Sequence, residues 1–181
     1  MQNSNMTVKD ICGIAIMAAI TTVLAQIIVP MPAGVPISLQ TFAIMLSGII
    51  LGPKYGAISS LIYLLMGIVG MPVFTGFRGG IQVFAGPTGG FLIAFPVLAY
   101  LSGMAIQHKK KSRVWMVFFL GLGLVVNYCL GVTFFCVIMD SSLFTAITAC
   151  VLPFIPGDII KTILAVIAGN KLRRRLEIAL S

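Results

Sequence analysis

The chain has 181 residues, of which 59% are hydrophobic and only 9% are charged. Soluble domains average roughly 45–50% apolar and about 25% charged residues, so this composition excludes a soluble globular protein and predicts an integral membrane protein. The net charge of +8 does not indicate nucleic-acid binding, because the basic residues lie at the ends of apolar runs and not along an amphipathic face.

Six apolar segments are candidates for membrane helices, since a span needs about 20 apolar residues, or fewer when it is buried among other helices. They cover residues 11–29, 39–51, 55–69, 89–106, 114–139 and 143–169. We therefore predict an all-α integral membrane protein with six transmembrane helices, forming a single domain over 1–181. The first segment leads into further membrane sequence without a small-residue cleavage site, so we expect a helix there and not a signal peptide.

Small residues mark one face of the first segment. Ala15 and Ala19 are four positions apart, a small-xxx-small pattern that lets another helix approach closely. The spacing alone does not distinguish docking of a partner protein from packing inside the chain's own bundle.

The two loops expected opposite the N-terminus differ from plain connectors. The first, VPMPAGVPIS, is rich in proline, and the second, MPVFTGFRGGIQVFAGPTGG, is rich in glycine and contains Arg78. Restricted loops with one cation are typical of a ligand lid, and a tightly packed re-entrant turn is the alternative. Between them, Gln40 opens the second segment, and Gly52 with Pro53 predicts a turn that separates the second and third segments.

Polar residues are rare within the last two segments. Asn127 lies in the fifth, and its amide offers both donors and acceptors to a ligand with an amide or urea group, as does that of Gln40. An amide in a membrane helix also often just bonds a neighbouring helix.

Asp158 and Lys161 lie in the sixth segment, within PFIPGDIIK. Three positions apart on a helix, they share one face and can pair, either as an internal salt bridge or as part of a ligand site. Pro156 and Gly157 indicate that the helix breaks or begins there, leaving backbone N–H groups free.

The basic residues predict the topology. Ten of the twelve lie on the side of the N-terminus, Arg78 lies opposite, and only Lys161 falls within a span. This bias predicts that both termini are cytoplasmic.

Motifs for catalysis are missing from the sequence. It has no GxxxxGK[ST] for ATP and no HExxH for zinc. The cysteines at 12, 129, 136 and 150 lie in apolar segments without CxxC spacing, so we expect neither a metal site nor a disulfide. We predict that the chain is not an enzyme and that any transport draws energy from an ion gradient or from partner proteins.

The chain resembles the BioY proteins, which are biotin-specific S components of energy-coupling factor (ECF) vitamin transporters. The resemblance covers nearly the full length and rests on PISLQTF, LGPKYGAISSLIYLLMGIVGMPVF, FRGGIQVFAGPTGGFLIAFP and PGDIIK. GPTGG followed by an aromatic residue and PGDxxK are specific in combination. Phe91 follows GPTGG where many relatives have tyrosine, so a hydroxyl is missing there.

The resemblance implies a six-helix protein of the prokaryotic plasma membrane that binds biotin near the outer face. It assigns ligand contacts to Gln40, Asn127, Asp158 and Lys161, and Arg78 is a candidate for the valerate carboxylate. It also implies that the motif formed by 15 and 19 docks a transmembrane coupling protein of the EcfT type, which works with two cytoplasmic ATPases. The ligand is biotin, and no cofactor is expected.

Two other functions stay open at the level of sequence. One is an S component for another vitamin, such as thiamine or riboflavin. The other is a self-sufficient secondary transporter or channel in which Asp158 and Lys161 relay protons.

Overall fold

The structure is a computed structural model that describes residues 6–31, 34–107 and 113–180. Its elements are α1 (Val8–Ala25), β1 (Ile28–Val29), β2 (Ile37–Ser38), α2 (Gln40–Leu51), α3 (Pro53–Ile68), the 3-10 helix η1 (Ile81–Val83), α4 (Gly89–Gln107), α5 (Arg113–Met139), α6 (Leu143–Cys150) and α7 (Phe154–Leu180). Apart from the short strands β1 and β2, the regular structure is helical, which confirms the predicted all-α fold class.

The predicted segments all contain helices, but these differ in length. Among the described residues, α1, α4 and α5 are long and apolar enough to cross a membrane, and the bent pair of α6 and α7 makes a fourth candidate. The 12 residues of α2 extend only about 18 Å, less than a hydrocarbon core of about 30 Å. The second and third segments therefore form two separate short helices, α2 and α3, as the predicted turn between them implies.

Two of the predicted segments are not single continuous helices. Segment 143–169 is not one continuous helix, because α6 and α7 meet at a bend of 47°, and the chain forms turns at 151–153, where Pro153 has no N–H to continue a helix. Segment 11–29 ends early as a helix. Ile28 and Val29 pair antiparallel with Ser38 and Ile37, so the first loop is a hairpin whose β-branched residues favour strand geometry.

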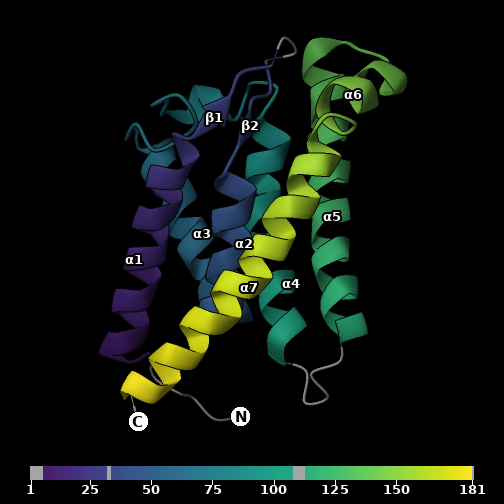
Figure 1. The fold of residues 1–181 in the computed structure, drawn as a ribbon. Helices are drawn as coiled ribbons and strands as arrows, with labels where there is room; N and C mark the ends of the chain where they lie inside the picture. The colour runs from purple at the N-terminus through teal and green to yellow at the C-terminus, as the bar shows by residue number, and fades with distance from the viewer. Residues whose placement is uncertain (1–5, 32–33, 108–112, 181) are drawn as a thin grey trace.

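The short helix α2 lies at the centre of the bundle, between α1, α3, α4 and α7 (Figure 1). Glycines allow this close packing. A Cβ on Gly56 would lie 2.6 Å from the Cα of Gly48, and one on Gly48 would collide with the carbonyl of Ala99 in α4. Gly52 turns the chain from α2 into α3 with a φ of 84°, a conformation that glycine adopts at little cost.

The two ends of the bundle differ in what they carry. The start of α1 and the end of α7 lie at one end, whereas the hairpin and α6 lie at the other (Figure 1). Lys9 and Lys54 begin α1 and α3 at the first end, and Arg78 lies in the loop after α3 at the second. The predicted basic cluster 109–111 lies outside the described residues, as do the side chains of Arg113 and Arg174.

Candidate functional site

A pocket lies at the end of the bundle that carries the hairpin. It is formed by the hairpin, α2, the loop after α3, and the helices α4, α5 and α7, and its cavity volume is about 50 Å³. Its lining is Val35, Pro36, Ser38, Gln40, Thr41, Phe74, Thr75, Val83, Thr88, Phe91, Leu92, Tyr128, Phe154 and Lys161. Apolar walls with a few polar groups are typical of small-molecule sites, and this pocket has that character.

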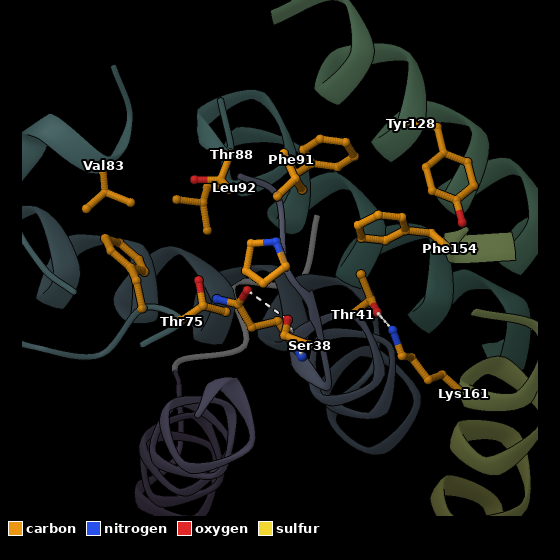
Figure 2. A pocket seen from close by; sticks show the side chains of 14 residues that line it. Ser38, Thr41, Thr75, Val83, Thr88, Phe91, Leu92, Tyr128, Phe154 and Lys161 are labelled. Atoms are coloured by element: carbon orange, nitrogen blue, oxygen red, sulfur yellow. Dashed lines mark hydrogen bonds between the residues drawn. The ribbon is translucent and has the colours of Figure 1, made fainter. Parts of the chain in front are cut away.

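Aromatic side chains form much of the wall. Figure 2 shows Phe91 from α4, Phe154 from α7 and Tyr128 from α5 around the pocket. Phe74 is nearly fully buried, and its ring meets the edge of Tyr63 at a centroid distance of 5.5 Å. These rings offer flat apolar contact to a ligand.

The polar floor of the pocket is an ion pair on α7. The ammonium of Lys161 lies 2.8 Å from Oδ1 of Asp158, and the two side chains keep only 8% and 3% of their exposure. Thr41 donates to the same Oδ1 at 3.3 Å, and the Tyr128 hydroxyl donates to Oδ2 at 2.5 Å. The carboxylate thus accepts from three side chains, and Lys161 is the member of the pair that lines the pocket.

A second polar group lines the pocket at the start of α2. Gln40 Oε1 accepts from the Ser38 hydroxyl at 3.1 Å, and its Nε2 donates to the Tyr63 hydroxyl at 2.5 Å. Tyr63 in turn donates to the carbonyl of Val73 at 3.1 Å. Gln40 is therefore fixed by α3 and by the loop that follows α3.

The other two predicted ligand residues do not line the pocket. Asn127 is buried at 1% exposure, and its Oδ1 has no hydrogen-bond partner among the described residues. Arg78 is exposed, and its carbonyl accepts from the N–H of Phe74 at 2.9 Å. The structure brings together Gln40, Lys161 and, through its hydrogen bonds, Asp158.

The expectation of free backbone N–H groups at Pro156 is wrong. The helix α7 begins earlier, at Phe154, and the N–H groups of Phe154 and Ile155 both donate to the carbonyl of Val151. Pro156 has no N–H to offer. The polar character of this helix start therefore comes from side chains.

Sequence reasoning missed two members of the polar floor. Neither Thr41 nor Tyr128 is among the ligand residues predicted from the sequence. Thr41 follows Gln40 directly, so the signal was a pair of polar residues at the start of an apolar helix. Within the described residues, no group of three His, Cys, Asp or Glu side chains is placed to hold a metal ion.

The small residues of α1 face away from the bundle. Ala15 and Ala19 are exposed, whereas Ala18 on the other face is buried. A shallow groove beside them is lined by Ile16, Ala19, Ile20, Val23 and Leu24, almost wholly apolar. Packing inside the chain's own bundle therefore does not account for Ala15 and Ala19.

Comparisons with known proteins agree with this architecture. The model of the BioY family matches residues 1–178. A protein from Pyrococcus horikoshii named "Probable biotin transporter BioY" is 39% identical over 168 residues, covering 93% of this chain and 98% of the relative. A biotin transporter BioY from Rhizobium etli is 37% identical over 176 residues, covering 91% and 93% of the two chains.

A solved structure shares the fold. The crystal structure of the S-component for biotin from an ECF-type ABC transporter superposes with a TM-score of 0.84 at 34% identity, covering 96% of this chain and 95% of that one. Given this match and that of the family model over 1–178, the chain belongs to the BioY family.

Proposed function

We propose that this chain binds biotin in the pocket above Lys161 and acts in biotin uptake as the S component of an ATP-driven ECF transporter. Its relatives are named biotin transporters, and the solved structure with the same fold is an S-component for biotin. The observation that carries the proposal for the site is the buried ion pair whose lysine faces an aromatic pocket. Stability alone is a weak reason for such a pair.

The chemistry of biotin fits the polar groups. Its ureido ring offers two N–H donors and a carbonyl acceptor, and its valerate chain ends in a carboxylate. Lys161 donates to an oxygen of the ligand, while Asp158 holds the ammonium in place. Gln40 supplies an amide to the same pocket, and the rings of Phe91 and Phe154 cover the apolar bicycle.

Asn127 and Arg78 complete the proposed set. The buried Oδ1 of Asn127 lacks a partner, so it suits a ureido N–H that arrives with the ligand. Arg78 lies on the loop whose Phe74 and Thr75 line the pocket, and it pairs with the valerate carboxylate. Such a charge-assisted contact contributes roughly 1.5–3 kcal/mol.

The proposed partners are a coupling protein of the EcfT type and two cytoplasmic ATPases. The exposed face of α1 with Ala15 and Ala19 supports docking of a membrane helix. With ten of the twelve basic residues on the side of the N-terminus, both termini are cytoplasmic. The pocket then opens toward the outer face of the plasma membrane.

A ligand panel tests this function. Purified protein is heated in detergent with biotin, thiamine or riboflavin, and the midpoint of thermal unfolding is recorded. Only biotin is expected to raise the midpoint, because only a ligand that binds the folded state stabilises it. A rise with thiamine or riboflavin alone would reassign the vitamin.

A vesicle assay tests the need for ATPases. Vesicles that contain only this chain are expected to show no biotin uptake, and addition of the coupling protein and ATPases is expected to start it. Uptake by the chain alone that an uncoupler collapses would instead support a secondary transporter.

A further inference from the structure

One side chain of α1 ties down a wall of the pocket. Gln26, the residue that caps the C-terminal end of α1, donates from Nε2 to the carbonyls of Val73 at 3.3 Å and Phe74 at 3.1 Å. The same Nε2 also donates to the carbonyl of Thr22 in α1. Its Oε1 accepts from the N–H of Phe77 at 2.8 Å. The segment 69–80, which we call the wall loop, is thus bonded to α1 at three points.

The wall loop needs such anchors because of its backbone. Gly70, Gly76 and Gly80 have φ values of 104°, 71° and 95°, and Phe77 also has a positive φ of 56°. Glycine adopts these values at little cost, but a bulky residue rarely does. Such a conformation persists only where surrounding contacts hold it. Phe77 is 71% exposed, so packing of its side chain does little to hold this conformation. The hydrogen bond from its backbone N–H to Gln26 is one of the contacts that hold it.

The anchored wall loop shapes the pocket directly. Phe74 and Thr75 line the cavity, and Figure 2 shows Thr75 on the side opposite Tyr128 and Lys161. The ring of Phe74 is packed edge-on between Tyr63 and Phe84, at centroid distances of 5.5 Å and 5.6 Å. A shift of the Phe74 backbone would therefore move this wall of the pocket.

The carbonyl of Val73 joins two sets of contacts. It accepts from Gln26 of α1 at 3.3 Å and from the Tyr63 hydroxyl of α3 at 3.1 Å. Tyr63 is itself bound by the Nε2 of Gln40, which lines the pocket. A hydrogen-bonded path thus runs from the pocket through Tyr63 and Val73 to the end of α1.

We propose that Gln26 is a latch, a positioning residue that holds the wall loop against the pocket and makes ligand retention depend on the position of α1. The exposed side of the same helix carries Ala15 and Ala19. A partner that moves α1 there pulls on the Gln26 bonds and loosens the wall loop. The ligand readout of this inference rests on the proposed biotin function, whereas the latch itself is a contact of the ligand-free protein.

Matched variants isolate the latch. Gln26→Leu removes every bond to the wall loop, whereas Gln26→Glu keeps an acceptor for the Phe77 N–H but loses the donors to Val73 and Phe74. Thr22→Val is the control, because the Thr22 hydroxyl donates only to the carbonyl of Ala18 within α1, at 3.0 Å. It removes a side-chain hydrogen bond one turn away without touching the wall loop.

The first readout is amide hydrogen exchange without ligand. Peptides covering 69–80 are expected to exchange faster in Gln26→Leu than in the wild type, and Thr22→Val is expected to match the wild type. In Gln26→Glu the gain is expected to be smaller, because the Phe77 N–H keeps its acceptor. Unchanged exchange of 69–80 in both Gln26 variants would overturn the latch.

The second readout is the dissociation rate of radiolabelled biotin, chased with unlabelled biotin. Only folded, loaded protein contributes to this rate, so a loss of folded material does not imitate the effect. Gln26→Leu is expected to release biotin roughly tenfold faster, the factor that about 1.4 kcal/mol represents, and Thr22→Val at the wild-type rate. A rate within about twofold of wild type in both Gln26 variants would overturn the coupling of the latch to ligand retention. If wild-type protein retains no biotin, the proposed function fails, and hydrogen exchange alone decides the latch.

Discussion

At the scale of single residues, the central feature is a charge pair held inside the bundle. As whole residues, Asp158 and Lys161 are 2% and 6% exposed, and Lys161 Nζ donates to Asp158 Oδ1 at 2.8 Å. Burying charges carries a large desolvation cost, which mutual attraction offsets only when the remaining polar atoms are also bonded. Thr41 and Tyr128 provide those further bonds to the carboxylate.

Neutralising one partner is expected to destabilise the protein more than neutralising both. Asp158→Asn leaves the Lys161 ammonium buried without its counter-charge, a loss of about 3–5 kcal/mol. The double variant Asp158→Asn with Lys161→Gln leaves no buried charge and is expected to recover most of the stability. Thermal unfolding in the same detergent measures the stability of the single and the double variant. A double variant less stable than Asp158→Asn would contradict this interpretation of the pair.

Asn127 is expected to lower the stability of the ligand-free protein and to strengthen biotin binding. Its buried Oδ1 has no partner among the described residues, and an unpaired buried polar group costs about 1–3 kcal/mol. Asn127→Leu is therefore expected to raise the thermal midpoint of the ligand-free protein and to weaken biotin binding. Unchanged affinity for biotin would remove Asn127 from the site.

At the scale of elements, glycines set how closely the central helices approach. Gly48 of α2 lies against the carbonyl of Ala99 in α4, and Gly56 of α3 lies against Gly48. A methyl group at Gly48 has no room unless α4 moves. This packing holds α2, and with it Gln40 and Thr41, beneath the pocket.

Gly48→Ala is expected to lower the thermal midpoint and to weaken biotin binding, because α2 and α4 must separate. The matched control is Gly121→Ala on α5, where an added Cβ meets nothing within 4 Å. There the greater helix propensity of alanine, about 1 kcal/mol, favours slight stabilisation. The thermal midpoint and the biotin affinity are measured for both variants. Equal values in the two would argue against close packing at Gly48.

The sequence predicted the helices well where long apolar runs dominate, as in α4 and α5. It predicted a break of the last segment at Pro156 and Gly157, whereas the turns between α6 and α7 lie slightly earlier, at 151–153. The hairpin pairs two residues on each side, too few for an alternating pattern to be visible. Such short elements depend on tertiary contacts more than on local preference.

The site was predictable only in part. The spacing of Asp158 and Lys161 predicts their pairing, and the contact is present. Thr41 meets Asp158 across 117 positions and Tyr128 across 30, separations that no local pattern reveals. Arg78 and Asn127 are polar residues in suitable segments, yet neither lines the pocket, because residue type does not fix where a side chain points.

At the scale of the whole molecule, one face of α1 is left uncovered while the pocket lies at the far end of the bundle. Ala15 and Ala19 are exposed on this face, and Ala19 lines a shallow apolar groove on α1. The docking face and the ligand site that we propose thus lie on separate surfaces, and the bonds of Gln26 to the wall loop connect them.

Bulk on the exposed face of α1 is expected to block assembly and to spare binding. Ala15→Leu and Ala19→Leu add side chains where a coupling helix would approach, but they touch no pocket residue. Copurification with the coupling protein is expected to fall, while biotin affinity stays within about twofold of wild type. Val125→Leu, at an exposed position of α5, is the control. Wild-type copurification of both alanine variants would reject this docking surface.

The most direct measurement is a calorimetric titration of biotin into the wild-type protein and into the double variant Asp158→Asn with Lys161→Gln. We expect saturable binding of one biotin per chain in the wild type and no measurable binding in the folded double variant. Equal affinity in the two proteins, or no binding by the wild type, would contradict the claim that the pocket above this ion pair is the biotin site.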